Sequence, residues 1–278
     1  MLNRYLTTLG FIAIASSVQA EEVTVASYNI KHGQGMDGSI DLSRQADVLV
    51  ALDADLIALQ EVDFVTQRSG RVNQAARLAE LMSEKTGSDW RHIEAPAIEF
   101  EGGSYGNGLL FDDGSMDLID HRIVSLPGSP EGDGARSAAL VHLGFGDGKE
   151  LLIAATHLTH LNSATEENNT LQIASLEALD QAMTGDLPSI IAGDFNASAN
   201  EEDAVNFDTM AALDGLGWHV DSPMDGRSMS DGEPIVIDYI VSKNAETWEV
   251  VDADIFNEEG AIEASDHLPV SVTYRLAD

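Results

Sequence analysis

The sequence predicts an α/β domain. Short apolar runs rich in β-forming residues are mixed with stretches whose apolar residues recur at helical spacing, over nearly the whole chain. The strands are more numerous than a regular βαβ repeat allows, so we expect much strand-to-strand pairing. The chain has 278 residues, 44% of them hydrophobic, and no internal repeat or linker divides it, which suits one large domain.

The first half of the chain is expected to begin with a strand over residues 23–30, where β-formers alternate with smaller or polar residues. Residues 42–52 carry apolar side chains on one helical face, and Asp41 is placed to cap the helix. A short buried strand over 56–62 and a second amphipathic helix over 73–85 follow. Between residues 90 and 146, Gly-rich turns separate several further strands.

The second half is expected to open with a strongly apolar strand over 151–158. A helix over 166–183 follows, with Leu171, Ala174, Ala178, Leu179 and Ala182 on its inward face. The remaining expected elements are a strand over 189–195, a helix over 201–213, and strands over 235–241, 249–255 and 268–274.

Residues 1–20 have the pattern of a secretory signal peptide rather than of folded structure. Arg4 supplies the positive start, residues 6–14 form a short apolar segment, and small residues precede a cleavage site near Ala20. The apolar segment is too short to span a bilayer, and no later segment approaches the length needed. We therefore expect a mature domain, residues 21–278, that is exported to the periplasm or beyond; the alternative is that the segment is retained as an anchor.

The chain is strongly acidic and contains no cysteine. Its 48 acidic and 14 basic residues give a formal net charge of −34, and zinc–thiolate sites and disulfides are excluded. Such a surface repels polyanions at low salt, and there is no strong nucleic-acid footprint. Adaptation to a saline medium explains the same charge, because salt screens the repulsion. We expect a monomer.

Polar side chains follow six apolar strands at the point where each strand ends. Carboxylates and amides are the oxygen ligands that Mg²⁺ and Mn²⁺ prefer, and a pair of histidines suits a phosphate that is being cleaved. This pattern indicates a metal-dependent phosphoesterase. The residues are Asn29, Glu61, His157, Asp194, Asn196, Asp238, Asp266 and His267.

In this order, the six motifs resemble those of the endonuclease/exonuclease/phosphatase superfamily, which includes deoxyribonuclease I-like nucleases, sphingomyelinases and inositol-phosphate phosphatases. The resemblance extends from about Val23 to Arg275 and suggests a secreted, bacterial-type member. It implies a four-layer α/β sandwich, two packed and mostly antiparallel sheets flanked by helices. The motifs are Ser27-Tyr28-Asn29, Leu59-Gln60-Glu61, Thr156-His157, Gly193-Asp194-Phe195-Asn196, Asp238-Tyr239 and Ser265-Asp266-His267.

The resemblance implies that Glu61 is the principal Mg²⁺ ligand, with Mn²⁺ as the other candidate ion. Asn29 lies beside Glu61, and Asp266 lies near the metal. A carboxylate at the end of an apolar strand is costly unless it is paired or bound to metal. For Asn29 alone, an ordinary turn residue after a strand explains the sequence as well.

The resemblance also implies the catalytic residues. Asp194 and Asn196 are two residues apart and so share one face of an extended chain; Asp194 orients or deprotonates the attacking water, and Asn196 holds the phosphate or metal. His267 contacts the scissile phosphate, and Asp238 supports it, although Asp238 taken alone could cap a turn. At the position of His157, the deoxyribonuclease I-like and sphingomyelinase-like members carry a histidine, whereas the family nucleases that act on abasic sites generally lack one.

Two further residues are candidates for contact with the substrate phosphate. Arg136 opens a strand where family members often place a phosphate-contacting arginine, and a surface ion pair is the alternative. Asn107 lies where deoxyribonuclease I has a carboxylate that supports its first histidine, so this chain departs from the nuclease pattern there. Arg68 lies on a loop and is a candidate specificity residue.

The sequence therefore predicts a secreted, Mg²⁺-dependent hydrolase of phosphoester bonds. It acts by in-line displacement, with water activated by Asp194 and the charged oxygens stabilised by His157 and His267. Nucleic acids, phospholipids and small phosphoesters all remain open as substrates. A non-catalytic binding module on the same scaffold is the alternative, although such a module would be expected to lose some of these residues.

Overall fold

The computed structural model describes residues 22–128, 134–160, 165–199, 207–232 and 234–276. The expected signal peptide, residues 1–20, lies outside these ranges, as do residues 201–206 of the helix expected over 201–213. None of the helices in the described part of the chain is long and apolar enough to cross a membrane.

Two six-stranded sheets form the centre of the fold. The order in the first sheet is β11 (Glu249–Ile255), β12 (Val270–Arg275), β1 (Glu22–Asn29), β2 (Leu56–Phe64), β4 (Gly103–Asp112) and β3 (Trp90–Phe100). The order in the second sheet is β5 (Met116–Leu126), β6 (Arg136–Phe145), β7 (Glu150–His157), β8 (Ser189–Asp194), β10 (Asp238–Lys243) and β9 (His219–Val220). The pairs β1–β2 and β7–β8 are parallel, and the other pairs are antiparallel.

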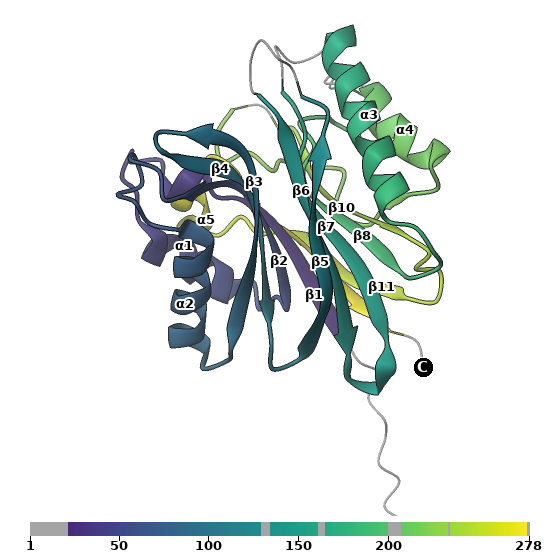
Figure 1. Cartoon of the computed structure of the whole chain (residues 1–278), viewed down its shortest axis with the longest axis horizontal. Helices are drawn as coiled ribbons and strands as arrows, with labels where there is room; N and C mark the ends of the chain where they lie inside the picture. Colours follow the sequence, from purple (N-terminus) through teal and green to yellow (C-terminus); the bar gives the residue numbers. More distant parts are fainter. Residues whose placement is uncertain (1–21, 129–133, 161–164, 200–206, 233, 277–278) are drawn as a thin grey trace, which may run out of the picture.

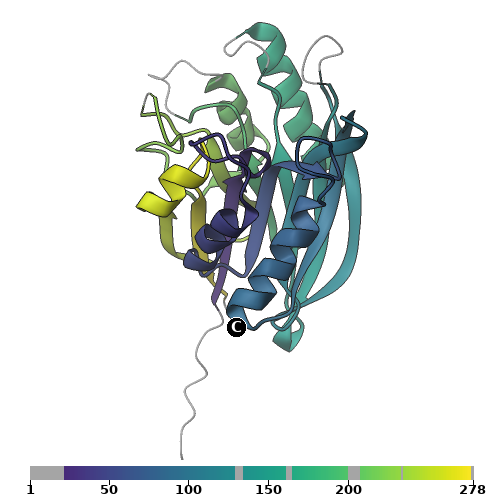
Figure 2. The ribbon, with the colours of Figure 1, turned by 90° about the vertical axis from the view of Figure 1, so that its left-hand side faces the viewer.

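Helices cover the outer face of each sheet (Figures 1 and 2). The first sheet is covered by α1 (Leu42–Ala51), α2 (Gln74–Thr86) and α5 (Glu259–Ala264), and the second by α3 (Glu166–Ala182) and α4 (Phe207–Gly215). Short 3₁₀ turns lie at Lys31–Gly33 and Gly146–Gly148. This arrangement confirms the four-layer α/β sandwich.

Three apolar cores fill the spaces between the four layers, and each central strand supplies two of them. In β1, Val23 and Val25 face the second sheet, whereas Ala26 and Tyr28 face the helices. Successive side chains of a strand point to opposite faces, so a strand covered on both sides must be apolar on both. This explains why the central strands appear in the sequence as continuous apolar runs.

The register of the parallel strands brings the site residues to one end of the sandwich. Asn29 pairs with Gln60 across β1 and β2, and His157 pairs with Asp194 across β7 and β8. The antiparallel β10 begins at the same end, with Asp238 opposite Asp194. Residues more than 200 positions apart in the chain therefore meet at one edge of the two sheets.

The structure corrects three expectations of the sequence analysis. The strand expected from residue 235 begins only at Asp238, because the backbone N–H groups of Ile237 and Asp238 donate to the hydroxyl of Ser228 instead of to a neighbouring strand. The sequence pattern did not predict α5 or the two-residue β9. The buried face of α3 is also rotated from the expected one and includes Asn168, Gln172, Ser175, Leu176 and Leu179.

Candidate active site

Asn29 connects the two sheets at the centre of the site. Its side chain is fully buried, and its Nδ2 donates to Oδ2 of Asp194 at 3.1 Å and to Oε1 of Glu61 at 3.3 Å. The backbone of Asn29 is fixed in turn by Ser265, whose hydroxyl donates to its carbonyl oxygen at 2.7 Å. The structure thus brings together the two candidate ligands expected beside the metal, Asn29 and Glu61, with Asp194 next to them.

Glu61 has an unusual backbone conformation. Its φ of 58° lies in the left-handed region, and the pairing of β2 with β4 shifts register between Leu59 and Val62. A bulge of this kind turns a side chain away from the regular alternation, and backbone strain of this type is frequent at functional sites. The bulge directs the carboxylate of Glu61 towards Asn29 instead of into a core.

The charge state of Glu61 is set by its neighbours. Burial by itself would raise the pKa of Glu61, but the neighbouring His32, the charge of His267 and the hydrogen bond from Asn29 outweigh it and hold the pKa well below its usual range. Nδ1 of His32 lies 3.9 Å from Oε2 of Glu61. Glu61 is therefore an ionised carboxylate, as a ligand for a hard cation must be.

His267 lies between two buried carboxylates. Its Nδ1 donates to Oδ2 of Asp238 at 2.9 Å, and its Nε2 lies 3.7 Å from Oδ2 of Asp194. Burial alone would lower the pKa of His267, but Asp238 and then Asp194 raise it to about 10. The imidazolium is therefore charged at neutral pH and can stabilise anionic oxygens. The support expected from Asp238 is present.

His157 and Asn196 form the other side of the site. Nδ2 of Asn196 donates to Nε2 of His157 at 2.9 Å and to the carbonyl of Leu158 at 3.1 Å. Nε2 of His157 also lies 3.3 Å from Oδ2 of Asp194. Burial, followed by the charge of Arg136, lowers the pKa of His157 well below its usual value, so this imidazole is neutral, unlike His267.

Asp194 is in contact with Asn29, His157 and His267. Burial first, and then the carboxylate of Asp238, raise the pKa of Asp194 to about 7, although His267 acts in the opposite direction. A carboxylate with a pKa near the working pH can accept a proton from water and release it again. This is the chemistry expected of a general base.

Asp266 is paired with a lysine. Its Oδ2 forms an ion pair with Nζ of Lys31 at 2.8 Å, and both side chains are partly exposed. Lys31 follows the end of β1 in a left-handed conformation, with φ of 46°. The expected role of Asp266 near a metal stays a prediction.

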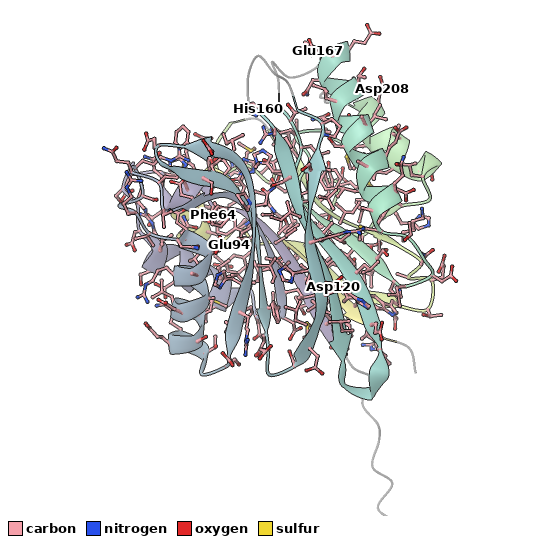
Figure 3. The ribbon with its side chains drawn as sticks, viewed as in Figure 1. Phe64, Glu94, Asp120, His160, Glu167 and Asp208 are labelled. Atoms are coloured by element: carbon pink, nitrogen blue, oxygen red, sulfur yellow. The ribbon has the colours of Figure 1, made fainter. Side chains whose placement is uncertain are left out.

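Arg136 lies near His157, where it lowers the histidine's pKa, and its Nη2 is 3.1 Å from Nδ1 of His160. Figure 3 places His160 at the end of the sandwich where β7 terminates. Nδ2 of Asn107 donates to the carbonyl of Ser137 at 2.7 Å, and Asn107 lines a narrow cavity with Arg136 and His157. The expected phosphate contacts of Arg136 and Asn107 stay predictions.

Sequence reasoning did not identify two residues that contact Glu61. The hydroxyl of Tyr105 is hydrogen-bonded to Glu61, and His32 lies beside the same carboxylate. Tyr105 is two positions from Asn107, which the sequence analysis did single out. This proximity was the one signal in the sequence that pointed near Tyr105.

Gln172 of α3 is a third residue that the sequence pattern did not reveal. Its side chain is buried, and its Nε2 donates to the carbonyls of Thr159, Phe195 and Asn196. These hydrogen bonds fix the loops that follow β7 and β8. Gln172 therefore helps to position His157 and Asp194 without touching either of them.

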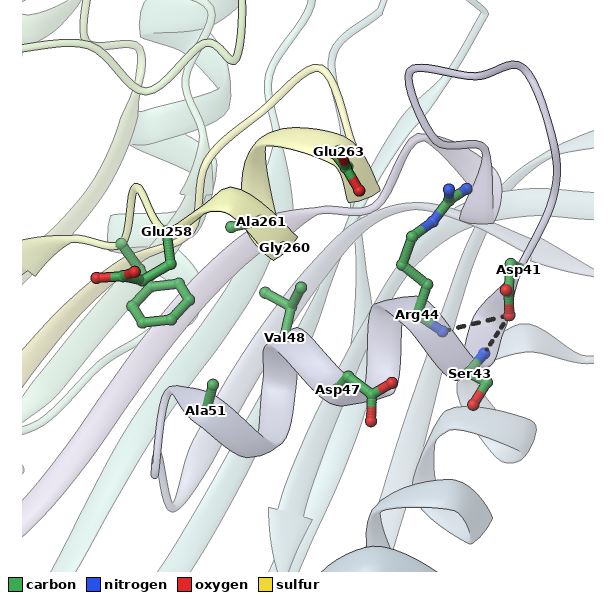
Figure 4. Close-up of a pocket in the computed structure, with 11 residues that line it drawn as sticks. Asp41, Ser43, Arg44, Asp47, Val48, Ala51, Glu258, Gly260, Ala261 and Glu263 are labelled. Atoms are coloured by element: carbon green, nitrogen blue, oxygen red, sulfur yellow. Dashed lines mark hydrogen bonds between the residues drawn. The ribbon is translucent and has the colours of Figure 1, made fainter.

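A cavity of about 350 Å³, larger than the narrow one beside Asn107, lies away from these residues between α1 and α5 (Figure 4). Carboxylates surround it, and its arginine, Arg44, is paired with Asp37 at 3.1 Å. Asp41, the expected N-cap, accepts hydrogen bonds there from the backbone N–H groups of Ser43 and Arg44. This cavity contains no histidine and none of the residues described above, so its size does not make it the site of the chemistry.

Two sheets that converge on a buried cluster of carboxylates, amides and histidines form the kind of site that suits the hydrolysis of phosphoesters. The chain belongs to the Endonuclease/Exonuclease/phosphatase family, whose model matches residues 26–267. No curated protein matches the chain.

Solved structures with the same fold come from bacteria and from humans. An endonuclease/exonuclease/phosphatase from Beutenbergia cavernae superposes with a TM-score of 0.73 at 23% identity, over 92% of this chain and 72% of that one. A mannosyl-6-phosphatase from Bacteroides thetaiotaomicron gives a TM-score of 0.66 at 18% identity, over 91% and 99%. The catalytic domain of human Nocturnin, solved with bound sulfate, gives 0.64 at 19%, over 92% and 95%. At these identities the likeness establishes the fold.

The family generally depends on a divalent metal, and the site contains groups that could bind one. Asp194, Asp238 and His267 each offer a ligand atom, all within 4.8 Å of one another. Oδ1 of Asp238 is buried and has no hydrogen-bond partner among the described residues, so it fits an additional donor or cation. However, His267 is protonated and bonded to Asp238, which leaves it poorly suited to coordination. The ionised Glu61, with Asp194 close by, fits a hard cation better. Asn29 could contribute only its Oδ1, which accepts from the backbone N–H of Lys31 at 3.0 Å, because its Nδ2 donates to both carboxylates.

Proposed function

We propose that this protein is a divalent-metal-dependent phosphoesterase that is exported after removal of residues 1–20. The observation that carries the proposal is the grouping of Glu61, Asn29, Asp194, Asp238 and His267 at one buried centre. A structural cluster would need only to be neutral and hydrogen-bonded, whereas this one holds a charged histidine and a carboxylate whose pKa is near 7.

The mechanism follows from the charge states. Asp194 accepts a proton from a water molecule as the water oxygen attacks phosphorus, and the bond from phosphorus to the leaving oxygen breaks on the opposite side. The His267 imidazolium stabilises the charge on the phosphoryl oxygens, while Asn196 and the neutral His157 contribute hydrogen bonds. Mg²⁺ or Mn²⁺ held by Glu61 and Asn29 would neutralise the phosphate and the departing oxygen. A proton from solvent completes the alcohol product.

Small phosphoesters are the favoured substrates within this proposal. The formal charge of −34 opposes the long-range approach of polyanions such as DNA. The likeness to a mannosyl-6-phosphatase supports small esters, and the likeness to Nocturnin does not by itself favour a polymer.

Hydrolysis of two chromogenic esters tests the proposed function. We expect p-nitrophenyl phosphate, bis-p-nitrophenyl phosphate or both to be cleaved with Mg²⁺ or Mn²⁺ and not with EDTA. Asp194→Asn should lower kcat at least about a hundredfold, whereas Asp208→Asn should not. Asp208 is an exposed aspartate on α4 and serves as the matched control (Figure 3). Absence of cleavage with either ester, or an Asp194→Asn variant with normal kcat, would contradict the proposal.

A further inference from the structure

A cavity of about 250 Å³ opens next to the candidate active site, and its outer part has no role in the mechanism above. It reaches Glu61 and His157 at its inner end. This volume is below the range of about 300–1,000 Å³ that is usual for pockets that bind drug-sized ligands, so it suits a single ring. The cavity is lined by Glu61, Arg68, Ile98, Phe100, Tyr105, Arg136, His157 and His160.

Arg68 is held rigidly in the wall of this cavity. Its Nε and Nη2 donate to the two carboxylate oxygens of Asp63, both at 2.9 Å, and Asp63 is fully buried. The guanidinium carbon lies 4.6 Å from the ring centre of Phe100 and 5.2 Å from that of Tyr105. A guanidinium fixed by a bidentate pair and by aromatic rings presents its remaining N–H groups in one direction.

The loop around Arg68 is fixed by further hydrogen bonds, which leave one nitrogen of the guanidinium available. The loop that contains Arg68 is also fastened by Thr66, whose hydroxyl donates to Oδ2 of Asp63 at 2.7 Å and is bonded to the hydroxyl of Ser69 at 2.8 Å. Nη1 of Arg68 donates to no other described residue. Its two N–H groups are therefore available to a ligand, beside an apolar surface formed by Ile98, Phe100 and Tyr105.

The charge around Arg68 argues against a second anionic group on the ligand. Asp63 already neutralises the guanidinium of Arg68, and the lining also contains one acidic residue, Glu61, and one other arginine, Arg136, whose formal charges are opposite. Hydroxyl groups can accept the hydrogen bonds of Nη1 without the repulsion that an additional carboxylate or phosphate would meet in so acidic a chain. The aromatic wall can pack against the C–H groups of a ring.

We propose that this cavity binds the leaving group of the substrate, and that Arg68 selects an uncharged, hydroxylated ring of sugar size. The proposal rests on the proposed phosphoesterase function, because the inner end of the cavity is the candidate catalytic centre. Arg68 acts in this scheme as a specificity residue.

Competition experiments with three small esters test the proposal. Glucose 1-phosphate, glucuronic acid 1-phosphate and ethyl phosphate are compared as inhibitors of the chromogenic reaction at fixed Mg²⁺. They carry, respectively, an uncharged hydroxylated ring, the same ring with a carboxylate, and no ring. We expect the inhibition constant of glucose 1-phosphate to be at least about tenfold lower than those of the other two, the scale of one or two hydrogen bonds with ring packing.

Variants then assign the preference to Arg68. Arg68→Lys keeps a cation beside the buried Asp63 but loses the planar fork. It should reduce the ratio of the ethyl phosphate inhibition constant to the glucose 1-phosphate inhibition constant from about ten to about three, the part that ring packing alone supplies. Arg91→Lys is the matched control, because Arg91 is an exposed arginine paired with Asp113 away from the cavity. Phe100→Leu should lower the same ratio about threefold by removing the aromatic plane, and it carries the test if Arg68→Lys does not fold by circular dichroism.

Three results would overturn the proposal: equal constants for glucose 1-phosphate and ethyl phosphate in the wild type, tighter inhibition by glucuronic acid 1-phosphate, or an unchanged ratio in a folded Arg68→Lys variant. Failure of the proposed function is distinguishable from these results. If neither chromogenic ester is hydrolysed, that function is wrong, and the affinities of the same three esters measured by calorimetry with Mg²⁺ still decide whether the cavity binds a sugar ring.

Discussion

Gly193 is the residue through which the packing of the second sheet should control the active site. It precedes Asp194 in β8 and pairs with Thr156 of the parallel strand β7, one position before the pair of His157 and Asp194. A Cβ atom at Gly193 would lie 2.1 Å from the carbonyl oxygen of Thr156. The carbonyl oxygen belongs to the backbone of the neighbouring strand, so it cannot move away as the end of a flexible side chain could.

The magnitude of the effect follows from this distance. Contacts below 3.0 Å are essentially never seen for a Cβ, so Gly193→Ala must separate the two strands locally by about 1 Å. Overpacking of this kind typically costs about 1–3 kcal/mol, which lowers Tm by about 2–4 °C per kcal/mol in a domain of this size. A misplacement of about 1 Å at reacting groups can cost about a hundredfold in rate. We therefore expect Gly193→Ala to remain folded at the assay temperature while its kcat falls by about a hundredfold.

Gly108→Ala is the matched control. Gly108 lies in β4 of the first sheet, and a Cβ there would meet its nearest atoms at 3.4 Å and 3.5 Å, in ordinary contact. Urea or thermal unfolding gives the stability of each variant, and hydrolysis of a chromogenic ester gives kcat. If Gly193→Ala kept the wild-type kcat, or if both alanine variants behaved alike, the strand register would not position Asp194 and His157 as we argue.

The remaining predictions concern the metal, the shared step, pH and salt. Glu61→Gln should leave the fold intact, weaken the dependence on Mg²⁺ in a metal titration and strongly reduce kcat; near-normal rates would refute its assignment as a ligand. Asp194→Ala and His267→Ala should each lower kcat at least about a hundredfold, and the double variant should lose far less than the product, because both act in one step. The pH profile should rise through about 7, where Asp194 ionises, and fall towards about 10, where His267 loses its proton. Because the folded pKa of His267 is above its unfolded value near 6.5, its contribution to stability should be complete below about pH 6.5 and be lost as pH rises to about 10, as melting curves across this range would reveal. Added NaCl should raise Tm by screening self-repulsion, and a KM for DNA that rose steadily from the lowest salt would instead indicate a basic groove.

The sequence by itself determined the fold class and most of the elements of the fold, and it indicated candidate site residues whose roles stay predictions. Local spacing sufficed for α1, α2 and the apolar strands, because burial on one or both faces imposes a period on the side chains nearby in the chain. The sequence also placed Asn29 and Asp194 at the ends of apolar strands, as the structure shows. It was wrong for His267, which lies in the segment between α5 and β12 and so precedes a strand instead of following one. The order of the six motifs then indicated the family.

Only the tertiary structure decided how these residues are charged and which of them touch. The two histidines that the sequence presented alike differ in charge, because His267 lies against Asp238 while His157 is buried beside Arg136. In the same way, Lys31 pairs with Asp266, and Asp63 fixes Arg68 in the cavity wall. These properties depend on burial and on distances between residues far apart in the chain, and such distances are set by the packing of the two sheets rather than by any local pattern of residues.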